Sequence, residues 1–319
     1  MNLADLAPNI IDPLAPKKRS HYVDAPFGYY GSKQRLASRI VEQLPPHNAW
    51  VEVFCGSAAV TLAKKPAPIE IINDIDSEVF NFFKQLRENG DELCRQIALT
   101  PYAREEFELA RKRQLAKNGI ERARRFLVSS MMTVNGTVGA AAHSGFSYSQ
   151  SYVRNGKEAR VNRWYTLPDK LAKVAERLRG VRVENRDARE LLAMFIHRPA
   201  TLAYLDPPYL MDREHGYRTD ARDQEFHVEL LRIACKAHCM ILISGYNNHV
   251  YNSILTKEHG WTKKLIFTTT RDTRGHDHKR TEVLWKNKAF EKARKSRQIP
   301  IHLSKMEREQ NKVNPARKG

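Results

Sequence analysis

Residues 201–209 read Thr-Leu-Ala-Tyr-Leu-Asp-Pro-Pro-Tyr, and this segment predicts a buried strand with a rigid end. Four of its first five residues are apolar, which is typical of a strand covered on both faces of a sheet. Pro207 and Pro208 lack backbone N–H groups, so the strand has to end at Asp206. The neighbouring carbonyl groups and the Asp206 carboxylate together form an array of hydrogen-bond acceptors.

Short apolar segments alternate with helical patterns on both sides of this stretch. We expect further strands at residues 50–54, 69–72, 181–184, 240–244 and 280–285. The spacing of apolar residues predicts helices at 32–44 (with Ser32 as its N-cap), 57–63, 77–95, 168–179, from 188 onward, and at 227–237. This alternation predicts an α/β fold with a mostly parallel sheet and helices on both faces. In such sheets, ligands bind beyond the carboxyl ends of the strands.

Three strand ends carry residues that suit a nucleotide-like ligand. The first expected strand leads into Gly56, where a glycine turn would let a ligand approach the N–H groups of the next helix. Asp74 ends the following strand about 20 residues later, an offset at which an acid commonly binds ribose hydroxyls. Asp187 follows a later strand and could contact an adenine amino group. The alternatives are a plain tight turn at Gly56 and helix N-caps at Asp74, ahead of Glu78, and at Asp187.

The composition gives the chain a strongly basic balance. There are 54 Lys and Arg against 36 Asp and Glu, which gives a net charge of +18 and a pI near 9.8. Residues 286–319 hold 11 Lys or Arg and three Glu, so the larger part of the excess lies in the body of the chain. A field of this sign attracts polyanions, of which nucleic acid is the commonest in a cell. A basic solvated surface with one adhesive tail is the alternative.

The middle of the chain departs from the α/β pattern. It begins with charged helix patterns near residue 100 and becomes rich in Gly, Ser and Asn from 135 to 156, as expected of an inserted domain. We therefore expect a flexible arm at 1–22, a core at 23–99 and 164–287, an insertion at 100–163, and a basic C-terminal tail at 288–319.

Cysteine usage indicates a reducing compartment and no metal. The four cysteines show neither a CxxC pair nor a disulfide framework, so reduced thiols in the cytoplasm fit best. Cys235, His238 and Cys239 fit a buried helix face better than a metal site, because no second ligand pair stands nearby. His-Asp-His at 276–278 fits a polar loop. We expect no signal peptide and no membrane span.

The acceptors at residues 206–209 suit a group that only donates hydrogen bonds, such as the exocyclic amino group of a nucleobase. The N6 lone pair of adenine is delocalised into the ring, so this nitrogen is a poor nucleophile. Hydrogen bonds from its protons to Asp206 and to the Pro207 carbonyl favour a tetrahedral nitrogen and free the lone pair. Tyr209 would stack on the base, which has to leave the duplex, and such stacking contributes about 1–3 kcal/mol. A structural strand-to-loop corner is the alternative.

Several segments together resemble the Dam-like, D12 class of DNA adenine N6-methyltransferases, which includes phage and orphan bacterial members. The likeness covers roughly residues 25–287, and the segments occur in the family's order. They are 26–33 (PFGYYGSK), 52–57 (EVFCGS), the strand end at Asp74, an insertion, 206–209 (DPPY), 244–246 (SGY) and 280–285 (RTEVLW). Two positions depart from the family pattern, since Val53 replaces its usual Pro and Ala58 replaces the second glycine of its loop.

The resemblance implies a Rossmann-like fold that binds S-adenosylmethionine and methylates N6 of adenine at specific sites in double-stranded DNA. Asp206, Pro207, Pro208 and Tyr209 would hold the target base. The implied cofactor residues are Tyr29, Gly31 and Lys33 at its methionine and adenine side, Glu52 and Gly56 near its methionine, Asp74 at its ribose, Asp187 at its adenine, and also Phe54, Ser57 and Asp206. Without the resemblance, Lys33 fits a surface helix and Glu52 fits a buried, paired acid.

The same likeness places target recognition in the insertion. We expect contacts to DNA phosphates from Arg104, Arg111, Arg113, Arg122, Arg124 and Arg125. Residues that could reach bases are Asn135, His143, Ser147, Tyr148, Arg154, Asn162 and Arg163.

Two other functions use the same residues. The acceptor array serves any exocyclic amine, so cytosine N4 in DNA or an amino group in RNA stays open as the acceptor. A catalytically silent DNA-binding relative is the second alternative, favoured by the departures at Val53 and Ala58. We expect a monomer on DNA, and a cognate restriction enzyme stays open.

Overall fold

The structure is a computed structural model of the 319-residue chain. The residues it describes are 22–29, 31–112, 116, 118–134, 145–154, 156–210, 221–271 and 277–301, with the backbone alone at 154, 221–223, 268–271 and 277–280. The arm expected at 1–22 therefore lies outside the described residues, apart from Tyr22.

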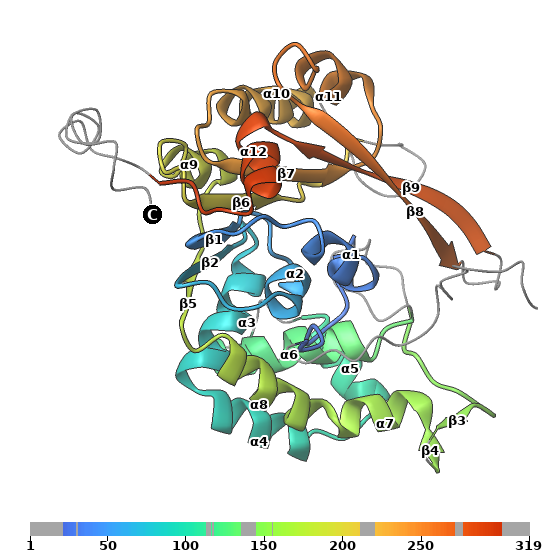
Figure 1. The fold of residues 1–319 in the computed structure, drawn as a ribbon. Coiled ribbons are helices and arrows are strands. Elements are labelled where there is room, and N and C mark those ends of the chain that lie inside the picture. The colour runs from blue at the N-terminus through green and yellow to red at the C-terminus, as the bar shows by residue number, and fades with distance from the viewer. Residues whose placement is uncertain are drawn as a thin grey trace, which may run out of the picture.

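A seven-stranded sheet in the order β5-β2-β1-β6-β7-β9-β8 forms the centre of the molecule (Figure 1). All the expected strands are present, and β8 is additional. Their bounds are β1 (Ala49–Glu52), β2 (Ile69–Asn73), β5 (Val181–Glu184), β6 (Thr201–Leu205), β7 (Met240–Gly245), β8 (Thr262–Arg271) and β9 (Asp277–Lys286). The pairs among β5, β2, β1, β6 and β7 are parallel, whereas β9 is antiparallel to β7 and β8. The predicted α/β fold with a mostly parallel sheet is confirmed.

Helices cover both faces of this sheet, as Figure 1 shows. One face carries α9 (Ala188–Ala193), α10 (Ala221–Cys235) and α11 (His249–Ile254). The other face carries the 3-10 turn η2 (Lys33–Arg35), α1 (Ala37–Val41), α2 (Ala59–Ala63) and α12 (Lys288–Ser296) over the central strands. Beyond these, α3 (Ser77–Glu88) and α8 (Leu167–Arg177) cover β2 and β5.

The two faces follow from strict alternation along the central strands. In β6, Leu202 and Tyr204 pack toward α1 and α2, whereas Ala203 and Leu205 pack toward α10. The same parity holds in β1, β7 and β9, and all these side chains are fully or almost fully buried. Burying one large apolar side chain stabilises the fold by about 1.5–3 kcal/mol. Parity therefore also fixes which face each polar residue at a strand end has to occupy.

Two expected helices differ from their predicted form. The helix predicted at 77–95 is interrupted, because Asn89 (φ −135°, ψ 36°) leaves the helical region between α3 and α4 (Gly90–Leu99). The helix predicted at 32–44 is shortened to η2 and α1. Ser32 does not cap it, since its Oγ instead lies 2.9 Å from Ser57 Oγ.

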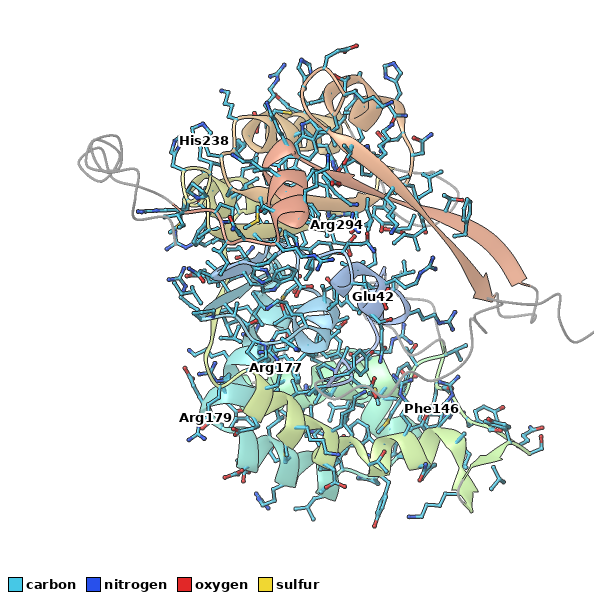
Figure 2. All side chains as sticks on the ribbon, in the orientation of Figure 1. Glu42, Phe146, Arg177, Arg179, His238 and Arg294 are labelled. Atoms are coloured by element: carbon cyan, nitrogen blue, oxygen red, sulfur yellow. The ribbon has the colours of Figure 1, made fainter. Side chains whose placement is uncertain are left out.

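The insertion is mostly helical and shares its core with the sheet domain. Its predicted range, 100–163, holds α5 (Arg104–Ala110), α6 (Gly119–Met131), the β3 (Val153–Arg154) and β4 (Lys157–Glu158) hairpin, and most of α7 (Ala159–Tyr165). Phe126 of α6 contacts Phe27 with ring centroids 4.9 Å apart and stacks on Phe82 of α3 at 5.8 Å. Arg177 of α8, labelled in Figure 2, bonds Glu70 of β2 at 2.6 Å. The insertion is thus packed onto the sheet domain through one continuous core.

The first residues of the predicted basic tail belong to the fold. Asn287 caps α12 by accepting from the Phe290 N–H at 3.0 Å, and Phe290 and Ala293 are buried. The remainder, from residue 302, lies outside the described residues. Across the described part of the chain, no helix is both long and apolar enough to cross a membrane.

Candidate functional site

Asp206 stands at the end of β6 with its two carboxylate oxygens in different surroundings. Oδ1 lies 2.7 Å from Lys33 Nζ, accepts a hydrogen bond from Ser244 Oγ at 2.9 Å and lies 3.2 Å from the Tyr209 hydroxyl. Ser244 is in turn hydrogen-bonded to the Tyr204 hydroxyl at 2.8 Å. Within the described residues, Asp206 Oδ2 makes no hydrogen bond. This oxygen is therefore free to accept one from a ligand.

Lys33 links Asp206 to a second buried acid, Glu282 of β9. Its ammonium lies 3.5 Å from Glu282 Oε1, donates to the Gly31 carbonyl at 3.2 Å and contacts the Tyr209 hydroxyl. Tyr209 donates to Glu282 Oε1 at 2.6 Å. Burial alone would lower the pKa of Lys33, but the charges of Asp206 and Glu282 outweigh it and raise that pKa. Burial raises the pKa of Glu282, and Lys33 opposes the rise.

Strand parity explains why these groups meet. Asp206 lies two residues beyond Tyr204, Ser244 two beyond Leu242, and Glu282 two before Leu284, and Tyr204, Leu242 and Leu284 all point to the α1 side of the sheet. β1 and β6 are neighbours, yet the chain continues from β1 toward β2 and from β6 toward β7. This is the switch point at which open α/β sheets bind ligands.

Position 56 requires a glycine for two reasons, its backbone conformation and the close approach of the Tyr29 ring. Its φ is +47°, a left-handed conformation, and a Cβ placed there would lie 2.8 Å from the Tyr29 ring. Its N–H donates to Asp74 Oδ2 at 2.8 Å. Ala58, which replaces a family glycine, is also left-handed (φ +54°), so this departure places mild strain where glycine would have none.

Asp74 does not cap a helix, so that alternative is wrong. Asp76 is the N-cap of α3 and accepts from the Glu78 N–H, whereas Asp74 Oδ1 accepts from the Asp76 N–H at 3.0 Å. Burial raises the pKa of Asp74. A carboxylate can accept about four hydrogen bonds, so its two backbone contacts leave capacity for a diol.

Buried Asn73 joins the loops that follow three strands. Its Nδ2 donates to the carbonyls of Val53 at 2.9 Å and of Arg186 at 3.1 Å, and its Oδ1 accepts from the Arg186 N–H. The chain ends of β1, β2 and β5 are thereby held together. The predicted cofactor residues that follow these strands share one edge of the sheet.

Glu52 is a buried acid that forms no salt bridge with any described residue. Its Oε2 accepts from the backbone N–H of Thr61 at 3.0 Å and from the Thr61 hydroxyl. Burial raises the pKa of Glu52 to about 8, and the two Thr61 hydrogen bonds only partly oppose this. Ser57, at 2% exposure, is likewise engaged inside the protein by its contact with Ser32.

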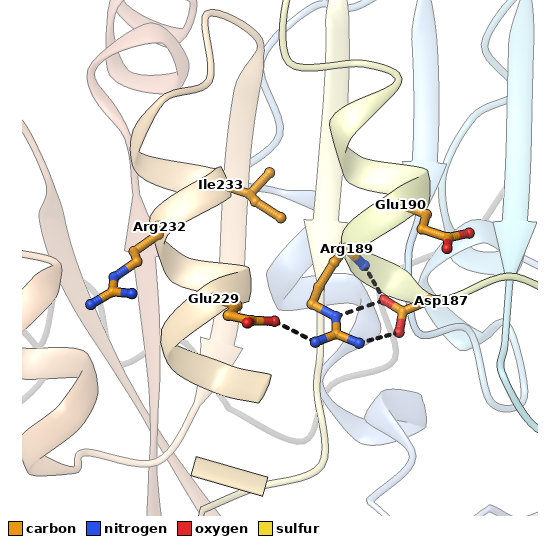
Figure 3. Close-up of a pocket in the computed structure, with 6 residues that line it drawn as sticks. All are labelled: Asp187, Arg189, Glu190, Glu229, Arg232 and Ile233. Atoms are coloured by element: carbon orange, nitrogen blue, oxygen red, sulfur yellow. Dashed lines mark hydrogen bonds and ion pairs between the residues drawn. The ribbon is translucent and has the colours of Figure 1, made fainter. Parts of the chain in front are cut away.

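Asp187 caps α9, as one interpretation predicted, and lines a hollow of about 440 Å³ between α9 and α10 (Figure 3). Arg189 holds both oxygens of Asp187, at 3.0 and 2.7 Å, and also pairs with Glu229. Its guanidinium lies 5.0 Å from the Phe226 ring, which meets Phe54 edge-on at 6.3 Å. The Arg189 contact lowers the pKa of Asp187.

The ring of Tyr209 lies beside a second aromatic ring. Tyr246, which follows β7, has its centroid 4.4 Å from that of Tyr209 at an angle of 55°. Gly245 makes room for this pair, since a Cβ there would lie 3.3 Å from Trp285 and 3.7 Å from Tyr209.

Several insertion residues are placed differently from the prediction. Arg122, Arg124 and Arg125 were expected to bind phosphates, but α6 packs between α3 and α5, so acids neutralise all three. Arg122 pairs with Glu78, Arg124 with Glu106 and Glu121 at 2.7 Å, and Arg125 with Glu121 at 2.6 Å. Ser147, at 5% exposure, is too buried to reach a base. Arg113, Asn135, His143 and the side chain of Arg154 lie outside the described residues.

Other insertion residues stay accessible. Tyr148, Tyr152 and Tyr165 are 59%, 65% and 68% exposed. Arg104 lies over the Phe146 ring at 5.0 Å, and Lys157 lies over Tyr165 at 3.5 Å. Arg111 contacts Glu108 at 3.7 Å, whereas Asn162 and Arg163 are half-buried.

Glu282, Ser244, Tyr246, Arg189 and Asn73 were not among the predicted site residues. The signal for Glu282 was an acid directly before the apolar run 283–285. For Asn73, Ser244 and Tyr246, only the packing of neighbouring strands reveals the contact. Arg189 follows Asp187 by two residues, but its pairing with Glu229 depends on how α9 packs beside α10. Histidines 276 and 278 have no described side chains, and no described group of three or more His, Cys, Asp or Glu is arranged to hold a metal.

Gly56→Ala is expected to destabilise the protein more than Gly31→Ala, by about 1–3 kcal/mol. Both glycines are left-handed, at φ +47° and +75°, so both variants acquire backbone strain. Only at Gly56 would the new methyl group also strike Tyr29, because no described atom lies within 4 Å of a Cβ at Gly31. Urea unfolding of both variants checks this, and equal decreases in stability would contradict it.

Comparisons with known proteins bear on the family of the chain. A family model of the D12 class N6 adenine-specific DNA methyltransferases matches residues 29–299. A search of curated proteins found no match. Two structures of an rRNA methyltransferase, AviRa from Streptomyces viridochromogenes, have TM-scores of 0.35 and 0.32 at 16% and 15% identity. They cover 83% and 82% of this chain and 89% and 87% of their own chains.

A protein from Legionella pneumophila has a TM-score of 0.25 at 12% identity, covering 84% of this chain and 86% of its own. The family match spans most of the chain, and the seven-stranded sheet is the Rossmann-like fold expected of it. The chain therefore belongs to the D12 class N6 adenine-specific DNA methyltransferase family.

Proposed function

We propose that this protein is a site-specific DNA methyltransferase that moves a methyl group from S-adenosylmethionine to N6 of adenine in double-stranded DNA, after the base leaves the helix. One observation carries the proposal. Among the described residues, Asp206 Oδ2 has no hydrogen-bond partner at the switch point of the sheet, while Lys33 and Ser244 hold the other oxygen. A fixed carboxylate with one free acceptor is what an exocyclic amino group requires.

The residues at the neighbouring strand ends fit the cofactor. The N–H of Gly56, in the loop after β1, holds Asp74, and Asp74 has spare acceptor capacity for ribose hydroxyls. Asp187 borders the hollow between α9 and α10, which we propose for the adenine. Tyr29, Gly31 and Lys33 lie on the same side, next to Gly56 and Asp206. When bound, S-adenosylmethionine supplies a methyl group activated by its sulfonium charge.

Asp206 and Pro207 have the central tasks in the proposed mechanism. Asp206 Oδ2 and the Pro207 carbonyl accept the two N6 hydrogens, so the nitrogen lone pair is no longer held in the ring. As the N–C bond forms, the bond between the methyl carbon and the donor sulfur would break, and its electron pair would stay on sulfur. N6 would then be positively charged and would release one proton to Asp206 Oδ2. Tyr209 stacks on the extruded base, and Pro207 and Pro208 keep the carbonyls fixed.

We also propose that the exposed surface formed by Arg104, Tyr148, Tyr152, Lys157 and Tyr165 contacts DNA. Aromatic rings beside cations favour bases and phosphates together. We propose this surface for DNA contact instead of the α6 arginines, whose charges are neutralised by acids. A DNA substrate also implies action in the cytoplasm.

Incubation with radiolabelled S-adenosylmethionine and assorted duplexes tests the proposed function. Digestion to nucleosides should give N6-methyladenine as the labelled product. Label in N4-methylcytosine, or in RNA alone, would assign another acceptor. Cofactor binding without any transfer would identify a silent DNA-binding relative.

Removal of residues 302–319 is expected to lower the salt dependence of non-specific DNA binding while methyl transfer persists. This segment carries five Lys or Arg and two Glu. For each DNA phosphate that the shortened chain no longer neutralises, the slope of log Kobs against log salt should fall by about 0.9. Fluorescence anisotropy between low and moderate salt measures it, and an unchanged slope would refute a DNA role for the segment. Deletion from Lys288 is no substitute, because it removes buried Phe290.

A further inference from the structure

We infer that Glu282 is a positioning residue that fixes the Tyr209 ring and spares Asp206 for the target amine, an inference that rests on the proposed function. Glu282 belongs to β9, the strand that runs antiparallel to its neighbours and lies beside β7. Because β9 runs opposite to β6, Glu282 lies near the start of the apolar part of its strand, whereas Asp206 follows the end of β6.

The hydroxyl of Tyr209 has one proton and two carboxylates within reach. Glu282 Oε1 lies 2.6 Å away and Asp206 Oδ1 lies 3.2 Å away, so the proton goes to Glu282. Lys33 contacts the same hydroxyl and can donate to its oxygen. The hydroxyl end of the Tyr209 ring is thereby held from two sides, and the Tyr246 ring lies beside it at an angle of 55°.

Lys33 also balances the two acids. It lies 2.7 Å from Asp206 Oδ1 and 3.5 Å from Glu282 Oε1, and all three side chains are at most 15% exposed. Without Glu282, both Lys33 and the Tyr209 hydroxyl would turn to Asp206. Asp206 would then carry more hydrogen bonds on Oδ1 and be a weaker acceptor for N6.

The position of Glu282 would favour an apolar residue if stability alone decided it. It is 3% exposed, and its neighbours Val283, Leu284 and Trp285 are fully buried. A buried carboxylate is unfavourable unless hydrogen bonds and charges compensate it. Among the described residues, the partners of this carboxylate are Tyr209 and Lys33, so its compensation comes from the site itself.

A double-mutant cycle with Glu282→Leu and Tyr209→Phe tests this coupling. Each single variant is expected to lower kcat by about tenfold with KM for DNA changed less than about threefold. The double variant should be no slower than the worse single variant, because both remove the same hydrogen bond. Decreases in kcat that multiply would overturn the inference, as would a change confined to KM.

Glu282→Gln is the matched control, since its amide oxygen can take the Oε1 position and still accept from Tyr209 and Lys33. It should keep kcat within about threefold of the unmodified protein. A decrease in kcat as large as that of Glu282→Leu would show that the charge, and not the hydrogen bond, is required, and would overturn the positioning role.

A measurement on the resting protein separates this inference from the proposed function. 3-Fluorotyrosine placed at position 209 of the full chain should give one narrow 19F resonance, which Glu282→Leu shifts and broadens and Glu282→Gln leaves nearly unchanged. Identical spectra in all three proteins would show that Glu282 does not hold the Tyr209 ring in place. If no DNA is methylated at all, the proposed function fails, while this spectrum still decides whether Glu282 fixes Tyr209.

Discussion

Asp206→Ala is expected to lower kcat for DNA methylation by about 10²–10³-fold while DNA affinity changes by less than about threefold. The variant removes the one oxygen that is free to accept from the target amine, but it leaves the exposed DNA-binding surface in place. It also leaves Lys33 with Glu282 as its only acidic partner among the described residues. Single-turnover methylation and fluorescence anisotropy measure the two effects separately.

Asp206→Asn tests whether the Oδ2 position has to be a hydrogen-bond acceptor. Lys33 and Ser244 both donate to the Oδ1 position, so the amide oxygen of Asn has to occupy it. The amide NH2 then takes the Oδ2 position, where a donor would face the N6 hydrogens. We therefore expect Asn to be as inactive as Ala despite its matched shape. Activity near that of the unmodified protein would show that Oδ2 does not bind the amine.

The control for both variants is Asp169→Asn, an exposed acid in the first turn of α8. It removes the same charge at a distance from the sheet edge, so methylation should stay within about twofold. An equal decrease in this variant would point to a general charge effect instead of a role for Asp206.

Local patterns were sufficient to predict six strands of the seven-stranded sheet and the acceptor turn. The β6 stretch is short, apolar and closed by two prolines, so neither its type nor its end depends on distant residues. The glycine turn at Gly56 was predicted for the same reason, and its left-handed φ confirms it. β8 was missed because it is an edge strand with Lys and Thr along it, and its apolar pattern is weak.

Contacts between strands and helices could not be read from local patterns. The pairing of Lys33 with Asp206, 173 positions apart, depends on η2 lying over β6, and that of Tyr209 with Glu282 depends on β9 lying beside β7. The basic run in α6 suggested phosphate contacts because two of its acidic partners, Glu78 and Glu106, lie on other helices, although a third, Glu121, lies in α6 itself. Charge along the sequence therefore overstated the charge available to DNA.

Glu52→Gln is expected to stabilise the protein at pH 8 by several kcal/mol, on the order of 2–5, and to have little effect near pH 5. Burial raises the pKa of Glu52 to about 8 from 4.5, so the folded protein keeps a proton that the unfolded chain releases. Stability from this group is therefore highest at low pH and falls as pH rises from 4.5 to about 8, by up to about 1.4 kcal/mol per pH unit.

Gln keeps the contacts of Glu52 without its titration. Its amide oxygen can accept from the Thr61 N–H and hydroxyl, so the packing of β1 against α2 is preserved. Urea unfolding at pH 5, 6, 7 and 8 should show the decline in the unmodified protein and a flatter profile in Glu52→Gln. A variant that is less stable than the unmodified protein at pH 8 would contradict the prediction.

Glu70→Gln provides a contrast of opposite sign, because Arg177 and Lys64 lower the pKa of Glu70. The stability from Glu70 is present above pH 4.5 and disappears as pH falls, so this variant should be destabilised at pH 8. The stability from two buried acids in neighbouring strands would thus change in opposite directions with pH.

If Glu52→Gln gains stability but loses affinity for S-adenosylmethionine, measured by calorimetry, the unfavourable acid in β1 serves cofactor binding at the expense of stability.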